Sequence, residues 1–245
     1  MTLQNPAHPS LHAIALGAEF SDLEEGARYA LLQRLAPALQ HHMMGKFQSM
    51  DMIAAMMERR LKSADPDLAG IREDCASLGS VSRIAVKSIM DLMTWIEPKA
   101  ASTLKFDAGV TECLGLLSTE FRFKGFVIVN EVREIDAKVS SRALRSVLSA
   151  ALIALSDLSK ASATLVIRAQ AMPGHVELSI DLRPTERVIK AYVTDSRALK
   201  WRDVEILALA ESVQLTRGDS AVQLTFAFPA ANAGLPDDLF IGAGI

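Results

Sequence analysis

The sequence has few of the features that mark secreted or membrane-spanning chains. Its 245 residues include only two cysteines, Cys75 and Cys113, which form no CxxC motif. Both fall within apolar helical patterns, so we expect no disulfide framework and a reducing compartment fits. No stretch approaches 18 consecutive apolar residues, and the first 20 residues lack a cationic start followed by an apolar run. We therefore expect a cytoplasmic protein without a signal peptide or a membrane-spanning helix.

The chain also lacks a strong charge of either sign. Its 26 basic and 29 acidic residues give a formal net charge of −3. Nucleic acids and anionic membranes attract strongly basic proteins, so this balance predicts neither as a partner. Half of the residues are hydrophobic and 22% are charged, as is typical of globular domains. A chain of this length can bury a core in one or two domains.

The pattern from residue 21 to about residue 62 predicts a long amphipathic helix. Ser21 and Glu24 have the spacing of a capping box, in which both side chains accept hydrogen bonds from free amides of the first turn. Pro37 should kink this helix one turn before His41. The apolar stripe that the pattern predicts, at steps of three and four, consists of Ala36, Met43, Phe47, Met50, Ala54, Met57 and Leu61.

A second long helix is expected between Asp65-Pro66, which suit its first positions, and Pro98, which ends it. Two long helices joined by a short turn form an antiparallel hairpin, and its apolar stripe is wider than one neighbouring helix covers. Two copies should therefore pair into a four-helix bundle, and we expect a homodimer. The stripe of this second helix is Leu68, Ile71, Cys75, Leu78, Ser82, Ala85, Ile89, Leu92 and Ile96.

After Pro98 the apolar period changes to a mixture of short strands and helices. Together the two parts predict an α+β protein, with a helical hairpin at residues 21–98 followed by a two-layer α/β sandwich at residues 102–229. Residues 1–20 and 230–245 are expected to be loose termini. The elements expected in the sandwich are strands at 103–106, 126–132, 164–169, 176–182, 213–216 and 222–228, and helices at 107–121, 141–158 and 202–212.

The segment that begins with His41 and His42 resembles the phosphoacceptor helix of bacterial histidine kinases. In that family apolar residues lie two, six and nine positions after the histidine, and Met43, Phe47 and Met50 match when His41 is the acceptor. The register with His42 as acceptor aligns these positions less well. The resemblance covers roughly residues 25–229, and it implies a dimerisation and phosphotransfer hairpin followed by a domain similar to the kinase ATP-binding domain.

The chain differs from the family pattern at three of the positions that follow His41. The family has an acidic residue directly after the histidine, a polar residue four positions on and a proline five positions on. This chain has His42, Gly45 and Lys46 at those places. The differences imply that self-phosphorylation and dephosphorylation are both absent. His42, Gly45 and Lys46 are candidates for supporting or docking roles, and the alternative is that they are ordinary surface residues.

The positions that bind ATP in the family are also changed. Two asparagines that hold Mg²⁺ and phosphate correspond to Ala150 and Ala154, and the adenine loop reads Arg183 and Thr185 where acidic and glycine residues are needed. Alanine has no oxygen to ligate a hard cation. Residues 185–205 contain no glycine, so the family's glycine-rich lid is missing as well. We therefore expect no ATP binding and no resident cofactor or metal ion.

This combination is similar to the dimeric histidine phosphotransferases of bacterial phosphorelays. The resemblance implies that His41 accepts a phosphoryl group from a receiver-domain aspartate and passes it on, with Mg²⁺ supplied by the receiver. The resemblance also implies that response-regulator receiver domains are partners of this chain, and that a hybrid histidine kinase is a further partner. Neutral imidazole is a competent nucleophile near pH 7. The alternative is a non-catalytic, pseudokinase-like module that binds a receiver domain or a kinase, so enzyme activity stays open.

The other unusual residues have simpler interpretations. Six of the ten methionines fall between residues 43 and 57, where they suit core packing or, alternatively, adaptable docking. Trp95 and Trp201 are expected to pack in the interior, and Cys75 to be buried in the bundle. His175 follows a Pro-Gly turn and is expected to flank it.

Overall fold

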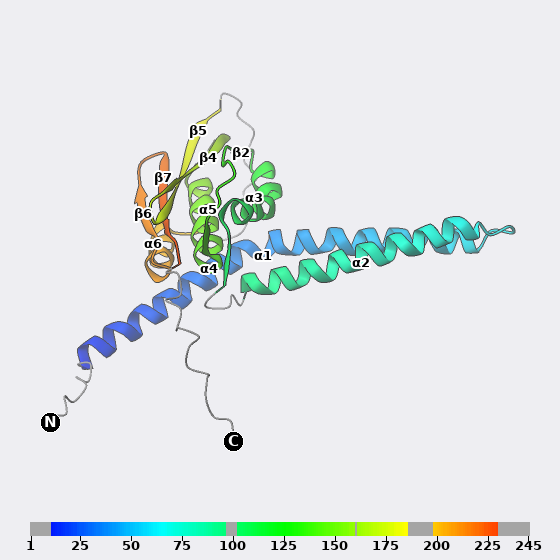
Figure 1. Ribbon diagram of the computed structural model, residues 1–245, viewed down its shortest axis with the longest axis horizontal. Coiled ribbons are helices and arrows are strands. Elements are labelled where there is room, and N and C mark those ends of the chain that lie inside the picture. Colours follow the sequence, from blue (N-terminus) through cyan, green and yellow to red (C-terminus); the bar gives the residue numbers. More distant parts are fainter. Residues whose placement is uncertain (1–10, 97–101, 160, 186–197, 230–245) are drawn as a thin grey trace, which may run out of the picture.

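The computed structural model describes residues 11–96, 102–159, 161–185 and 198–229. A helical hairpin projects from an α/β half that lies over its base (Figure 1). The hairpin consists of α1 (Leu11–Leu61) and α2 (Leu68–Ile96), which run side by side in opposite directions. Among the described residues, no helix combines the length and the apolar character that crossing a membrane would need.

Both helices of the hairpin begin at other residues than the capping patterns predict. The first helix begins at Leu11, so the predicted start at Ser21 is wrong and residues 11–20 are helical. No proline interrupts this stretch, and alanine, leucine and glutamate within it favour a helix. The second helix is capped by Asp67, whose Oδ1 accepts a hydrogen bond from the Gly70 amide at 2.9 Å. Asp67 therefore takes the capping role that the sequence suggested for Asp65.

Pro37 lies inside α1. Proline has no amide hydrogen to donate to the preceding turn, and its ring crowds the carbonyl group there, so it bends a helix. Figure 1 shows α1 changing direction where it leaves the α/β half. The proline therefore separates an early part of the helix from the part that pairs with α2 and carries His41.

The α/β half is built around a five-stranded mixed sheet with the order β2-β4-β5-β7-β6. The pair β2-β4 is parallel, because helices connect these strands, and the other pairs are antiparallel hairpins or neighbours. The pair β1-β3 forms a separate small sheet. The strands are β1 (Thr103–Lys105), β2 (Val127–Asn130), β3 (Lys138–Ser140), β4 (Ala163–Met172), β5 (His175–Pro184), β6 (Gln214–Arg217) and β7 (Ala221–Ala227).

Helices pack against this sheet and form the second layer. They are α3 (Phe106–Phe123), α4 (Ser141–Ala143), the π-helical turn η1 (Leu144–Leu148), α5 (Ser149–Leu158) and α6 (Trp201–Ala210). The elements α4, η1 and α5 form the continuous helix predicted at 141–158. Residues 149–156 are buried all round, because α5 is surrounded by other elements. The predicted α+β fold, a helical hairpin followed by a two-layer sandwich, is confirmed.

The early part of α1 packs on the α/β half, which the sequence did not predict. Ala27, Leu31, Leu35 and Ala38 are buried, and the first three belong to the same core cluster as Phe106. Their spacing of four, four and three residues places them on one face of the helix. This stripe lies beside the one predicted for the hairpin. As a result, α1 serves both halves of the molecule.

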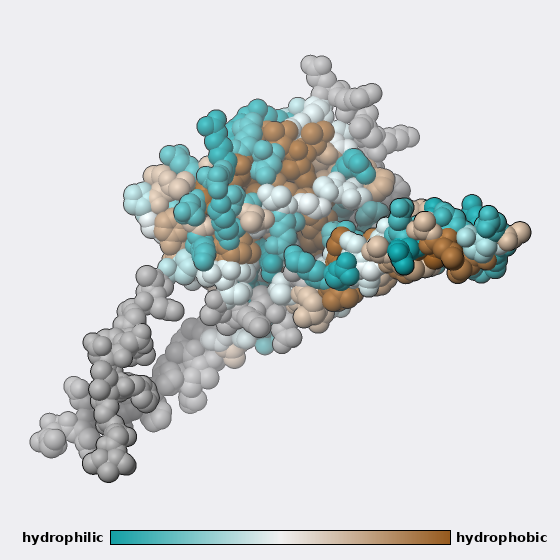
Figure 2. All heavy atoms as spheres, turned by 45° about the vertical axis from the view of Figure 1, so that its right-hand side comes forward, coloured by the Kyte–Doolittle hydropathy of each residue, from teal (hydrophilic) through white to brown (hydrophobic). Residues whose placement is uncertain are grey.

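Some predicted burial in the hairpin is not found in the single chain. Cys75 is exposed in the single chain, whereas Cys113 is buried. The burial of Cys75 was predicted for the paired four-helix bundle and stays a prediction. Figure 2 shows apolar side chains interspersed with polar ones along the projecting hairpin. The large apolar residues exposed on it are Met44, Phe47, Met52, Met56, Leu61, Leu68, Ile84, Val86, Met90 and Met93.

Candidate functional site

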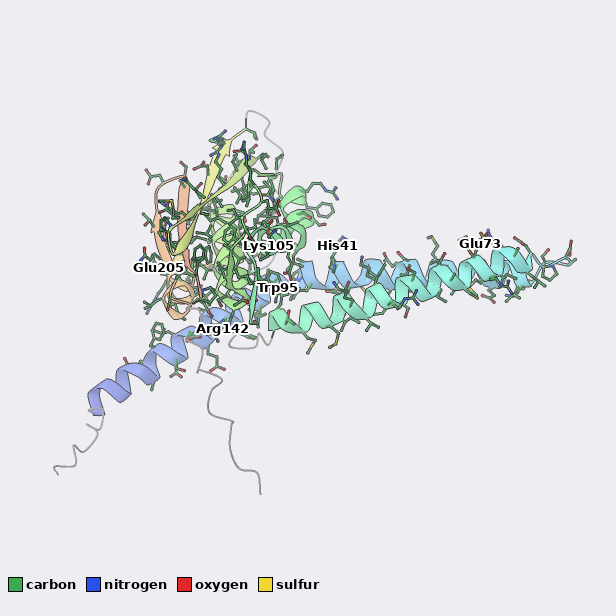
Figure 3. All side chains as sticks on the ribbon, viewed as in Figure 1. His41, Glu73, Trp95, Lys105, Arg142 and Glu205 are labelled. Carbon is green, nitrogen blue, oxygen red and sulfur yellow. The ribbon has the colours of Figure 1, made fainter. Side chains whose placement is uncertain are left out.

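His41 lies on α1 one turn beyond Pro37, and its side chain is exposed. Figure 3 shows it beside the α/β half, on the side of α1 that faces away from α2. A cavity of about 510 Å³ opens next to it, between α1 and the C-terminal end of α3. Besides His41, the residues that line this cavity are Pro37, Ala38, Thr119, Glu120, Phe123 and Lys124.

Most of the accessible surface of this cavity is apolar. Phe123, at the last position of α3, is 65% exposed and forms part of the wall. Pro37 and Ala38 supply the wall on the α1 side. We call this space the His41 cavity.

A buried charge cluster lies behind the His41 cavity. Arg34 is only 2% exposed, and its Nη2 donates hydrogen bonds to Glu120 Oε1 at 3.1 Å and to Asp157 Oδ1 at 3.0 Å. Lys124 Nζ lies 2.9 Å from each of the same two carboxylate oxygens. Two cations therefore face two anions, and the cluster has no net charge. It joins α1, α3 and α5.

Such a cluster holds its elements in one arrangement. Each buried charge needs its partners, because desolvation of an unpaired ion costs several kcal/mol. Asp157 Oδ2 also accepts a hydrogen bond from the Leu199 amide at 3.1 Å, and this bond attaches the residues just before α6 to the cluster. The early part of α1 is thus fixed to the α/β half by charges as well as by its apolar stripe.

A second ion cluster fixes α1 two turns earlier. Glu211, at the end of α6, is almost fully buried between Arg28 of α1 and Arg142 of α4. Arg142 Nε lies 2.7 Å from Glu211 Oε1, and Arg28 also binds Glu24 at 2.9 Å. Burial acts to lower the pKa of Arg28, but its hydrogen bonds to Glu211 and Glu24 outweigh this and raise the pKa above the usual value.

His42 faces different surroundings from His41, because neighbouring residues of a helix point about 100° apart. It lines a second, more polar cavity of about 600 Å³ with residues of α2, α3 and η1, among them Lys87, Ser88, Thr111 and Arg145. The structure therefore places the two histidines in separate cavities on the two sides of the contact between α1 and α3.

The second cavity is bounded by a satisfied polar cluster. Glu112 accepts a hydrogen bond from Trp95 Nε1 at 2.6 Å and pairs with Arg145 Nη2 at 3.0 Å. The Arg145 guanidinium lies 5.4 Å from the centre of the Trp95 ring, and its Nη1 donates to Thr94 Oγ1 at 2.7 Å. Trp95, which Figure 3 shows at the base of the hairpin, thus links α2 to α3 and η1.

Gly45 and Lys46 lie on α1 one turn beyond the histidines. Gly45 is exposed, and a Cβ atom at this position would meet nothing within 4 Å. Packing within the single chain therefore does not require a glycine there. Its carbonyl oxygen accepts a hydrogen bond from Ser49 Oγ at 2.9 Å. Lys46 is partly buried, and neither residue lines the His41 cavity.

The positions expected to have lost ATP binding lie away from the two histidine cavities. Ala150 and Ala154 are both 0% exposed on α5, inside the core. Arg183 is exposed on β5, and Thr185 donates hydrogen bonds from its amide and its hydroxyl to the Ser162 carbonyl oxygen. In the described residues, no group of three or more histidine, cysteine, aspartate or glutamate side chains could hold a metal ion. Most of the lid segment lies outside the described residues.

The charge cluster and the His41 cavity were not predicted from the sequence. Arg34 carries a usable signal, because it interrupts the apolar stripe of Ala27, Leu31, Leu35 and Ala38. A single charged residue within a buried stripe indicates a buried ionic partner. Glu120, Lys124 and Phe123 carry no comparable signal, because surface helices commonly end in such residues.

No model of a known protein family matches the chain, and no curated protein matches its sequence. Solved structures do resemble it. The histidine kinase AdeS of Acinetobacter baumannii is 14% identical, with 75% of this chain and 98% of that chain covered and a TM-score of 0.40. A blue-light-activated histidine kinase of Erythrobacter litoralis is 12% identical, with 80% of this chain and 63% of that chain covered and a TM-score of 0.42. A bacterial phosphotransferase is 10% identical, with 91% of this chain and 100% of that chain covered and a TM-score of 0.37.

Proposed function

We propose that this chain is a histidine phosphotransfer protein of a two-component phosphorelay. In this proposal, His41 accepts a phosphoryl group from a receiver-domain aspartate and passes it on, without binding ATP. The observation that carries the proposal is the contrast between two sites. His41 is exposed on a long helix, whereas Ala150 and Ala154 are sealed in the core and offer no oxygen to magnesium.

The phosphoryl transfer requires little more from this chain than an accessible imidazole. The unprotonated ring nitrogen of His41 attacks the phosphorus of the aspartyl phosphate, so an N–P bond forms as the O–P bond breaks. The aspartate leaves as a carboxylate, and the imidazole releases its other ring proton to solvent. Transfer from phosphohistidine to a second aspartate is the reverse reaction. Magnesium on the receiver offsets the charge of the phosphoryl oxygens, and the helix provides orientation.

The hairpin also supports the proposal of a homodimer. Val86, Met90 and Met93 are exposed apolar residues on one face of α2, and they leave an apolar surface without a partner in the single chain. Contiguous exposed apolar surface of this kind is typical of an interface. Pairing of two hairpins into a four-helix bundle would bury it. The His41 cavity opens between α1 and α3, so pairing through this surface of α2 leaves His41 accessible.

A transfer assay with two histidine variants tests this function. Receiver domains are phosphorylated with radiolabelled acetyl phosphate and Mg²⁺, freed of the donor, and mixed with the protein. We expect label on the wild-type protein and on His42→Ala, and loss of at least about 100-fold in the rate for His41→Ala, since the nucleophile is gone. Both histidines are exposed, so each variant serves as the folding control for the other.

The other outcomes of this assay are equally informative. Loss of label in His42→Ala with retention in His41→Ala would assign the acceptor role to the polar second cavity and reject our register. Tight binding of receiver domains without any transfer would favour the non-catalytic binding module instead.

A further inference from the structure

We propose that the His41 cavity is a docking site for an apolar side chain of the receiver domain that exchanges phosphoryl with His41. Phe123, on the wall of the cavity, is then the residue of the α/β half that selects this partner. This inference rests on the proposed function, because it concerns the partner of that same histidine. It assigns to the α/β half a part in recognition that does not depend on nucleotide.

The character of the cavity determines what it can accept. Its volume of about 510 Å³ accommodates one or two large side chains, and most of its accessible surface is apolar. The charged residues in its wall, Glu120 and Lys124, are paired with each other and with Arg34 and Asp157. No net charge is therefore left to attract an anionic ligand, and an apolar group is favoured.

The location of the cavity indicates which macromolecule covers it. His41 lines the cavity, so a protein that brings an aspartyl phosphate into bonding distance of the imidazole comes against Phe123 as well. Phe123 is 65% exposed although it is a large aromatic residue, and aromatic residues at pocket edges are common energetic centres of interfaces. A second copy of this chain is a less suitable occupant, because no residue of α2 lines the cavity.

The charge cluster gives the docking site a fixed shape. Arg34 lies three residues before Pro37 on α1, and it joins this helix to Glu120 of α3 and to Asp157 of α5. Both walls of the His41 cavity, Pro37-Ala38 on one side and Phe123 on the other, are therefore attached to the same buried cluster. A preformed pocket loses less conformational entropy when a partner binds than one that must first assemble.

The test compares Phe123→Ser with Leu209→Ser, since Leu209 is 68% exposed on α6 and does not line the cavity. The probe is the receiver domain that gives the fastest transfer to the wild-type protein. We expect Phe123→Ser to raise the Kd for this domain about tenfold or more and to slow transfer accordingly, and Leu209→Ser to leave both unchanged. Potassium phosphoramidate, a small phosphoryl donor that needs no docking, should phosphorylate His41 in all three proteins at the same rate.

The controls separate failure of this inference from failure of the proposed function. If no receiver phosphorylates the wild-type protein while phosphoramidate does, the proposed function fails and the inference falls with it. If a receiver phosphorylates the wild-type protein and Phe123→Ser equally well, with equal Kd, only the docking site is rejected. A change in the dimer mass of Phe123→Ser without a change in receiver binding would show that a second copy occupies the cavity, which also overturns the inference.

Discussion

His41 and His42 are adjacent in sequence and differ in what surrounds them. The first lines an apolar cavity backed by neutralised charges, and the second lines a polar cavity with Lys87 and Arg145. The sequence predicted which residues could carry the chemistry, because an imidazole is recognisable by type. The difference between their cavities was not predictable, since it depends on α3, which is remote in the chain.

The two cysteines also differ, and the difference can be measured. Burial raises the pKa of the Cys113 thiol to about 12, whereas Cys75 is exposed. Because the thiolate is the reactive form, we expect iodoacetamide at pH 8.5 to leave Cys113 unmodified in the native protein and to modify it in guanidinium chloride. Mass spectrometry of peptides counts the adducts. Modification of Cys113 in the native protein would contradict the burial described above.

At the scale of elements, α1 has two roles that its sequence pattern does not separate. Apolar residues at steps of three and four predicted the helix correctly from Ser21 onward. They could not show that Leu31 and Leu35 pack on the α/β half, whereas the later part of the helix pairs with α2. Most elements of the α/β half were predicted closely because each is bounded by turns or a change of period, but the three-residue strand β3 (Lys138–Ser140) was missed. The docking of α1 depends on contacts with α3, α5 and α6, and the period of an apolar stripe does not show which element covers it.

The buried charge cluster predicts a large effect for one substitution in α1. Replacing Arg34 by methionine keeps the length of the side chain and leaves Glu120 and Asp157 with Lys124 as their remaining buried cation. We expect the free energy of unfolding to fall by about 3–5 kcal/mol, since breaking a buried ion pair leaves an uncompensated charge in the protein interior, away from water. Urea denaturation followed by circular dichroism measures this change.

Arg59→Met provides the matched control on the same helix. Arg59 is exposed in the hairpin, so its replacement should change the free energy of unfolding by no more than about 0.5 kcal/mol. Equal effects of the two substitutions would mean that the cluster does not hold α1 against the α/β half.

At the scale of the whole molecule, the exposed surface of α2 predicts self-association. We expect a mass of twice the 26.5 kDa of one chain in light scattering after size exclusion. Replacing both Val86 and Met90 by aspartate should shift the protein to the monomer mass, because charges buried at a helix interface are strongly unfavourable. Leu209→Asp, on the exposed side of α6, should leave the dimer intact. A wild-type monomer at micromolar concentration would contradict the four-helix bundle.

The central claim concerns the whole chain: it receives phosphoryl groups from proteins and not from ATP. The most direct measurement incubates the purified protein with radiolabelled Mg-ATP in one sample and with radiolabelled receiver domains in another, and then counts acid-labile label on the chain. Our account predicts label only in the sample with receivers. Label acquired from Mg-ATP in the absence of any other protein would contradict it.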